Sequence, residues 1–270
     1  MNAKQYALQT LKETSRTFFI PINGLPEGLQ EAVTSAYLCM RAIDEVEDHP
    51  TLDNQLKIEI LSQMSLSLQA INNKTTVADI TPYIAPYQDV IPEVSYNLAQ
   101  WALLAPNSIR PRICDATASM ADRMGYWANR NWRVETPAHL DQYTFSVAGA
   151  VGLLLSDLWG WYDNTQTDRG EAVGFGRGLQ AVNILRNHKE DKIRGVSFFP
   201  QGWQLEDMFD YARYNLNLAD SYTQSLPKGP ALNFCQIPLT LAHATLDVMA
   251  LGKPKLTRDQ VMALLAKIAS

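Results

Sequence analysis

Apolar residues recur at steps of three and four along most of the chain, which is the spacing of one face of an α-helix. Between Pro26 and Pro50 this pattern predicts a first long helix over residues 27–49, because proline favours the start of a helix and is excluded from its interior. Strict alternation of apolar and polar residues, which would indicate strands, is not found. We therefore predict an all-α protein of roughly nine or ten helices. The remaining helices are expected at about 53–71, 94–104 and 111–132, from residue 137 onwards, through 180–191, and at 204–225, 229–252 and 257–269.

The segment Ser15-Arg16-Thr17-Phe18-Phe19 is mostly polar and leads into Pro21. We expect a turn between two helices that offers hydroxyl and guanidinium donors. A simple helix cap uses the same residue types, so the sequence leaves both interpretations open.

The predicted helix over 27–49 acquires carboxylates in its last turns. Asp44 and Asp48 share a face with Arg41, because steps of three and four residues return to the same side of a helix. Carboxylates side by side in a protein repel each other and are costly to desolvate, so a divalent cation such as Mg²⁺ is their natural partner. A solvated acidic helix end would show the same charges. The residues on this stripe are Tyr37, Arg41, Asp44 and Asp48.

A second stretch, over residues 180–191, repeats this design with Asn183, Asn187 and Asp191 four residues apart. Two such helices facing each other would form a polar, cation-binding mouth over an apolar cavity. This repetition favours a metal site over a solvated helix end.

A third stretch, over residues 143–152, combines Tyr143 with small residues three and four apart. Small residues let either a second helix or a flat apolar ligand approach the backbone closely. Farther on, Gly174, Gly176 and Gly178 resemble a nucleotide-binding run. No strand precedes them and no βαβ pattern surrounds them, so we reject a dinucleotide fold.

The 270 residues, of which 46% are hydrophobic, show no shift in composition, so we expect one domain over residues 1–270. A formal net charge of −5 argues against a nucleic-acid partner. The three cysteines, Cys39, Cys114 and Cys235, are widely spaced within apolar helical patterns, which predicts reduced, buried thiols.

The N-terminus lacks the charged start, apolar core and cleavage site of a secretory signal. The most apolar stretch, residues 145–162, contains Ser146, Ser156 and Asp157, so we expect a buried helix and no transmembrane anchor. A cytoplasmic location is expected, and the sequence leaves peripheral contact with a membrane open.

At these stretches the chain resembles the squalene and phytoene synthase family, whose members join two prenyl diphosphates head to head on the all-α isoprenoid synthase fold. The resemblance covers nearly the whole chain and implies a single domain with a central apolar cavity. Two of its motifs are more similar to squalene synthases than to phytoene synthases. The four motifs, in the family's order, are Ser15-Arg16-Thr17-Phe18, Tyr37-x₃-Arg41-x₂-Asp44-x₂-Glu47-Asp48, Tyr143-x₃-Val147-Ala148-Gly149-x-Val151-Gly152 and Gln180-x₂-Asn183-Ile-Leu-Arg186.

The resemblance implies Mg²⁺ ligands on two helices. Metal ions there would neutralise the charge that develops when an allylic diphosphate leaves. The implied ligands are Asp44 and Asp48 on the first helix, and Asn183, Asn187 and Asp191 on the second.

The resemblance also assigns a prenyl diphosphate substrate to the other motif residues. Arginines and hydroxyls would bind the diphosphate, and apolar groups would keep the carbocation away from water. Tyr143 would assist proton removal or steer the cation, with Arg41 and Tyr37 as further catalytic residues. The implied substrate-binding residues are Ser15, Arg16, Thr17, Phe18, Tyr37, Arg41, Val147, Ala148, Gln180 and Arg186.

Two positions depart from the family pattern. Asn187 stands where the family has the first aspartate of the second motif, and Val196 stands where an arginine is common. An asparagine can ligate Mg²⁺ through its amide oxygen but adds no charge, so metal affinity should weaken there. Asn183, Asn187 and Asp191 also reproduce the spacing of the metal triad in terpene cyclases.

Three functions therefore stay open. The first is squalene synthesis from two farnesyl diphosphates through presqualene diphosphate, with NADPH supplying the final hydride. The second is a phytoene-type synthase, terpene cyclase or partial synthase on the same fold that releases a different product. The third is a non-catalytic protein that binds apolar chains, which the retained carboxylates and arginines argue against.

Overall fold

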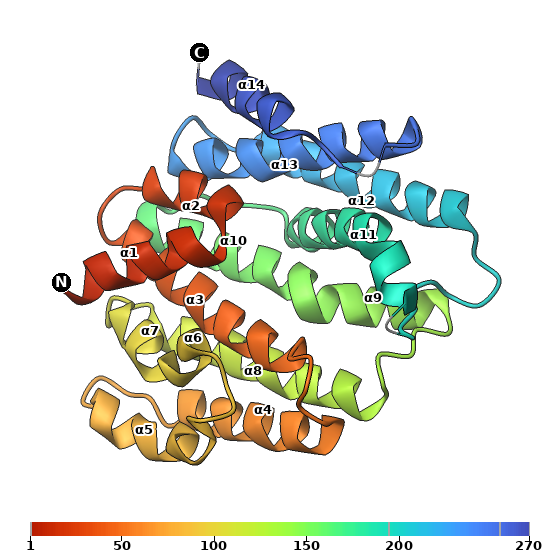
Figure 1. The fold of residues 1–270 in the computed structure, drawn as a ribbon. Coiled ribbons are helices and arrows are strands. Elements are labelled where there is room, and N and C mark those ends of the chain that lie inside the picture. Colours follow the sequence, from red (N-terminus) through yellow and green to blue (C-terminus); the bar gives the residue numbers. More distant parts are fainter. Residues whose placement is uncertain (1, 194, 254, 270) are drawn as a thin grey trace. The chain divides into compact units, whose positions relative to one another are not determined.

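The computed structural model describes residues 2–193, 195–253 and 255–269; for Arg16 and Ala269 only the backbone is described (Figure 1). Within these residues the chain is helical and forms no strand, which confirms the predicted fold class. It divides into two compact units, Met1–Asn131 with Trp161–Asp163, and Trp132–Gly160 with Asn164–Ser270. The expected single domain over residues 1–270 stays a prediction.

The first unit is built around α3 (Leu29–Glu47), the predicted first long helix. Its apolar face is fully buried, including Leu38 and Ile43, and it packs against helices on several sides. The side chains of Trp101 and Trp127 fill the same core. The other helices of this unit are α1 (Ala3–Thr14), α2 (Arg16–Asn23), α4 (Asn54–Gln69), α5 (Val77–Ile84), the 3₁₀ turn η1 (Ala85–Tyr87), α6 (Glu93–Tyr96), α7 (Leu98–Leu104) and α8 (Arg110–Asn129).

The predicted polar turn at residues 15–19 is wrong, because residues from Arg16 onwards already belong to α2. Ser15 alone forms the junction: its backbone N–H donates to the carbonyl of Leu11 at 2.8 Å, and its hydroxyl accepts from the N–H of Phe18 at 3.1 Å. One serine therefore caps the end of α1 and the start of α2, as the capping interpretation predicted.

The number of helices was also underestimated, since the described residues form fourteen α-helices. The predicted helix over 94–104 is interrupted at Asn97, which ends α6 and begins α7. Pro82 lies inside α5, and the helix continues for two more residues, to Ile84.

The second unit is organised around α11 (Arg169–Ile193), which is longer than predicted and includes the glycine run. It contacts helices that precede it and helices that follow it in the chain. The helix with the small residues is not regular, since α-helical turns flank a π-helical segment, η2 (Phe145–Gly149). The other helices are α9 (Pro137–Thr144), α10 (Ala150–Asp163), α12 (Leu205–Ser225), α13 (Pro230–Ala250) and α14 (Arg258–Ala269).

The glycines of α11 serve helix packing. A Cβ atom on Gly176 would lie 2.1 Å from the carbonyl oxygen of Ala148, and one on Gly174 would lie 2.5 Å from Cβ of Leu218. From the opposite direction, a Cβ on Gly152 would lie 2.0 Å from the carbonyl oxygen of Ala172. Backbone therefore meets backbone where α11 crosses η2 and α10. This confirms the rejection of a nucleotide-binding run and favours helix packing for the small residues.

The structure confirms that the cysteines are reduced and buried, and it also bears on the prediction that the chain has no transmembrane anchor. Cys39, Cys114 and Cys235 are free and buried, and burial raises the pKa of the Cys114 thiol to about 11. No described helix combines the length and the apolarity needed to cross a membrane.

We expect Gly176→Ala to lower the melting temperature, because the added methyl group would overlap the backbone of Ala148. Overpacking of this kind costs about 1–3 kcal/mol. Gly125→Ala is the matched control in α8: its added Cβ would have no neighbour within 4 Å, and alanine in a helix interior should add about 0.5–1 kcal/mol. Thermal unfolding followed by circular dichroism checks both, and equal melting temperatures would contradict the packing argument.

Candidate metal and diphosphate site

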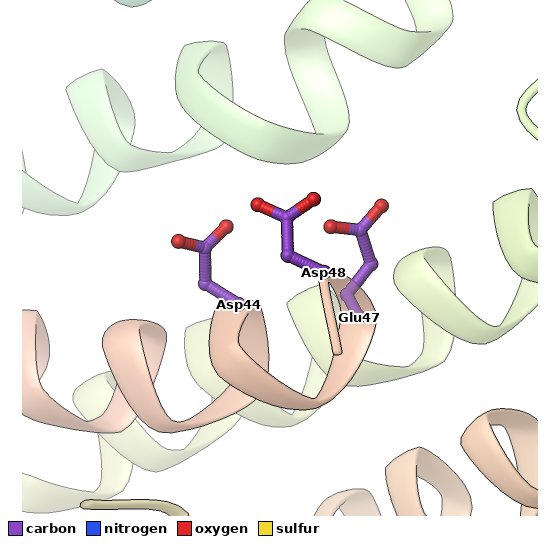
Figure 2. A group of neighbouring side chains, drawn as sticks. All are labelled: Asp44, Glu47 and Asp48. Atoms are coloured by element: carbon purple, nitrogen blue, oxygen red, sulfur yellow. The ribbon is translucent and has the colours of Figure 1, made fainter. Parts of the chain in front are cut away.

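The last turn of α3 gathers three carboxylates, those of Asp44, Glu47 and Asp48. One oxygen from each lies within 4.8 Å of the others, and Figure 2 shows all three side chains leaving the helix in the same direction. Asp48 is exposed and ends the helix, whereas Glu47 is buried. Among the described residues this is the one group of three or more His, Cys, Asp and Glu side chains close enough to share an ion.

The three carboxylates lie at the carbonyl end of α3, which makes their negative charges still less favourable. The last carbonyls of a helix carry partial negative charge, which favours cations and disfavours carboxylates there. The last turn of α3 contains no basic residue. Partial burial and the negative charge of Asp48 raise the pKa of Asp44 to about 6, although Arg41 lowers it. This carboxylate set suits a hard divalent cation such as Mg²⁺, which prefers oxygen ligands.

Arg41 lies one turn before the cluster and is paired within its own helix. Its guanidinium donates to Asp44 at 2.9 Å and also to Glu45. The sequence predicted Arg41 as a diphosphate ligand but did not identify Glu45 as its partner. The arginine therefore offsets part of the negative charge of the cluster, while its Nε has no hydrogen-bond partner among the described residues.

The other predicted residues of the first unit lie at the start of α2 and along α3. The ring of Phe18 packs on Tyr37 with centroids 5.8 Å apart, which joins α2 to the predicted stripe. Burial raises the pKa of the half-buried Tyr37 hydroxyl, so this side chain stays neutral. Thr17 is exposed, and the side chain of Arg16 lies outside the described part of the chain.

The second predicted set lies along α11, where helical spacing places the residues on one face. Asp191 is buried, Asn183 and Asn187 are half-buried, and Arg186 is exposed. The guanidinium Nε of Arg186 donates to the amide oxygen of Asn187 at 3.2 Å. Gln180 precedes them on the same helix and is half-buried. The structure thus brings each predicted set together on its own helix, and a shared mouth between the two sets stays a prediction.

The carbonyl oxygen of Asp191 accepts a hydrogen bond from the N–H of Val196 at 3.0 Å. Val196 therefore closes the turn after α11 with its backbone. Its side chain carries none of the charge that an arginine would add there.

Tyr143 is buried near the end of α9 and stacks on Phe198, with ring centroids 4.5 Å apart and planes inclined by 19°. The π-helical segment begins two residues later and contains Val147 and Ala148, both half-buried. A π-helical turn holds one more residue than an α-helical turn, so the side chains after it rotate away from those before it. The regular helix that the spacing predicted after Tyr143 is therefore interrupted at this segment.

A polar network holds α9 beside this segment. The hydroxyl of Tyr211 on α12 donates to the carboxylate of Asp141 at 2.8 Å and lies 2.9 Å from the hydroxyl of Thr144. Arg177 on α11 donates to the backbone carbonyl of Asp141 at 3.1 Å. Burial and the Asp141 hydrogen bond raise the pKa of Tyr211, so it stays protonated as a donor. Three helices are thus fixed around Tyr143.

Sequence reasoning missed Glu47 as a candidate metal ligand. The signal was present, because Glu47 stands three residues after Asp44 and one before Asp48, which places it on the same side of the helix end. It also belongs to the quoted motif. Its burial, which the sequence did not predict, distinguishes it from a solvated surface charge.

Comparison with solved structures defines the class of fold. A structure described as the complex of TcSQS with the ligand BPH1237 superposes with a TM-score of 0.79 at 22% identity, over 98% of this chain and 86% of that one. A dehydrosqualene synthase in complex with a ligand gives a TM-score of 0.70 at 17% identity, over 99% and 95%. The chain therefore has the all-α isoprenoid synthase fold that the motifs implied; its central apolar cavity stays a prediction.

Sequence comparison then shows the family. Residues 11–207, well over half of the chain, match the family model for squalene/phytoene synthase. The protein belongs to the squalene/phytoene synthase family. The squalene synthase of Schizosaccharomyces pombe is 30% identical over 272 residues, covering 88% of this chain and 58% of that protein. The squalene synthase of Rattus norvegicus is 27% identical over 271 residues, covering 91% and 63%. The chain thus spans about 60% of the length of these relatives.

We expect Asp44→Asn to raise thermal stability at pH 8 without divalent cations. The folded pKa of about 6 lies above the ordinary 3.8, so stability is lost as the pH rises between these values and the aspartate becomes charged. The Asp44 side chain is 39% exposed, and solvent screening limits the gain to about 1 kcal/mol, or about 3 °C in Tm.

The same variant should lose most of the stabilisation that added Mg²⁺ gives the wild type. Thermal unfolding with and without an excess of Mg²⁺ measures both effects. Asp122→Asn, an exposed change on α8, is the control. An Mg²⁺ response in Asp44→Asn equal to that of the wild type would exclude Asp44 as a ligand.

Proposed function

We propose that this protein catalyses the Mg²⁺-dependent head-to-head condensation of two farnesyl diphosphates to presqualene diphosphate and then to squalene. The observation that carries the proposal is the carboxylate group of Asp44, Glu47 and Asp48 within the family's motif on α3. We further propose that NADPH supplies the final hydride and that the reaction takes place in the cytoplasm. The apolar product would pass into a membrane that the protein contacts peripherally.

The chain's own groups divide into a polar and an apolar part. When bound, Mg²⁺ would neutralise the charge of the departing diphosphate. Asp44, Glu47 and Asp48 fit as its ligands from α3, since they are oxygen donors that repel one another until a cation binds. From α11, Asn183, Asn187 and Asp191 would hold further ions. Arg41, Arg186 and the hydroxyls of Ser15 and Thr17 would donate hydrogen bonds to the diphosphates.

The apolar part would protect the carbocation from water. Phe18 and Tyr37 pack together next to the polar stripe, and Val147 and Ala148 would line the prenyl chain from the π-helical segment. Tyr143 stacks on Phe198 and would assist proton removal or steer the carbocation.

Asn187 and Val196 favour a second candidate, a phytoene-type synthase, terpene cyclase or partial synthase that releases another product. Both residues lie where the second diphosphate would be handled, and neither carries the charge that is common in the family. The amide oxygen of Asn187 accepts a hydrogen bond from Arg186. The implied diphosphate ligand Arg186 is thus hydrogen-bonded to the implied metal ligand Asn187.

Product analysis tests the proposal. We expect the purified protein, given farnesyl diphosphate, Mg²⁺ and NADPH, to form squalene, and to stop at presqualene diphosphate when NADPH is omitted.

Asp48→Asn should lower diphosphate release by at least about 100-fold, since electrostatic stabilisation by a metal contributes several kcal/mol. Mass spectrometry of the products, with Asp122→Asn as the control, measures this. Geranylgeranyl diphosphate in place of farnesyl diphosphate tests chain length, and binding without turnover would indicate a non-catalytic protein.

Restoring a carboxylate by Asn187→Asp should lower the Mg²⁺ concentration needed for half-maximal activity. The reason is the added negative charge one helical turn before Asp191. For a squalene synthase with an amide ligand the product should remain squalene. For a cyclase-like triad the product distribution should change. An unchanged Mg²⁺ titration would mean that Asn187 does not contact the metal.

A further inference from the structure

Lys57 is a buried lysine whose place is explained by neither the hydrophobic core nor the motifs of the family. It is 7% exposed and lies on the buried face of α4, in line with Ile60, Leu61 and Met64. Lysine is almost never buried unless it is paired, because removing an ammonium group from water is costly. The protein therefore must contain a group beside Lys57 that offsets this cost.

That group lies at the end of α3. The Lys57 ammonium donates a hydrogen bond to the backbone carbonyl of Glu47 at 2.5 Å. Glu47 is both the last residue of α3 and a member of the carboxylate cluster. Its carbonyl is one of the four at a helix end that have no partner within the helix. Lys57 thus caps α3 from the next helix in the chain.

The charge of Lys57 also suits this place. A cation at the carbonyl end of a helix is stabilised by the helix dipole, and the last turn of α3 supplies no cation of its own. The three carboxylates add further negative charge within the same turn. Arg41 offsets it from the preceding turn, whereas Lys57 is fixed at the helix end itself.

We infer that Lys57 is a positioning residue for the metal site: it fixes the end of α3 so that Asp44, Glu47 and Asp48 keep their ligating arrangement before a cation binds. The inference rests on the proposed Mg²⁺ site. Groups that orient metal ligands from outside the coordination sphere commonly change metal affinity by 10–100-fold when removed.

Removing Lys57 should change the Mg²⁺ affinity in the direction opposite to that expected from simple electrostatics. Removing a positive charge next to a cation site should tighten Mg²⁺ binding if charge alone matters. Removing a positioning residue should weaken it, because the ligands lose their common arrangement. A residue that serves only folding would leave the affinity of the folded protein unchanged.

Mg²⁺ affinity of the full chain, measured by thermal shift and by calorimetric titration without substrate, distinguishes these cases. We expect Lys57→Met, which keeps a similar aliphatic stem, to raise the half-saturating Mg²⁺ concentration by about tenfold or more. Lys74→Met removes the same charge from an exposed turn of the same unit and should change it by less than about twofold. Lys57→Arg, which keeps a cation and donor, should recover most of the affinity.

Unchanged or tighter Mg²⁺ binding by folded Lys57→Met would overturn the inference while leaving the proposed function intact. If Lys57→Met does not fold, the shorter, uncharged donor in Lys57→Gln gives the same test in the same direction. A wild type that binds no Mg²⁺ would overturn both the metal site and the role of Lys57, and the product assay would show that independently.

Discussion

Repulsion between carboxylates at the carbonyl end of α3 is the constraint to which the rest of the first unit responds. Asp44, Glu47 and Asp48 add charge where the helix already presents partial negative charge. Such an arrangement is unfavourable without a cation, and the raised pKa of Asp44 records this cost. The surroundings of α3 hold it in place: its apolar face is fully buried, while Arg41 and Lys57 bring positive charge to its last turns. A helix fixed in this way would hold the carboxylates of the proposed metal site close together before a cation binds.

The second unit depends on close approach of helix backbones. Gly176 lets the backbone of α11 contact the backbone of η2, and Gly174 leaves room for the side chain of Leu218 on α12. Close contact at Gly176 places the next residue, Arg177, within reach of the backbone of Asp141. The end of α9, which carries Tyr143, is thereby tied to α11 and, through Tyr211, to α12. Packing and polar contacts therefore act together to fix the helix that carries Tyr143, the tyrosine proposed to assist proton removal or to steer the carbocation.

The chain belongs to the squalene/phytoene synthase family, and under the proposed function these two arrangements would serve one reaction. A diphosphate leaves more easily when its charge is neutralised, and a carbocation survives only where water is excluded. In the proposed reaction, the carboxylates of α3 and the polar face of α11 would meet the first requirement. The stacked Tyr143 and Phe198, and the paired Phe18 and Tyr37, would meet the second.

The sequence by itself determined the helical class, the long helix around residues 27–49, the buried thiols and the shared face of Asp44 and Asp48. These follow from spacings of three and four residues, which are local properties of a helix. It also suggested the two possible roles of Ser15 without separating them. The motifs, in their order, indicated the family.

Only the tertiary structure decided which of the open alternatives holds and which groups were missed. The small residues at 148–152 meet α11, the regular helix expected after Tyr143 contains a π-helical segment, and Lys57 lies under the end of α3. For the small residues and for Lys57 the physical reason is the same. A buried lysine or a glycine in a helix is unfavourable locally and is explained by a partner on another helix, and helical periodicity carries no information about that partner.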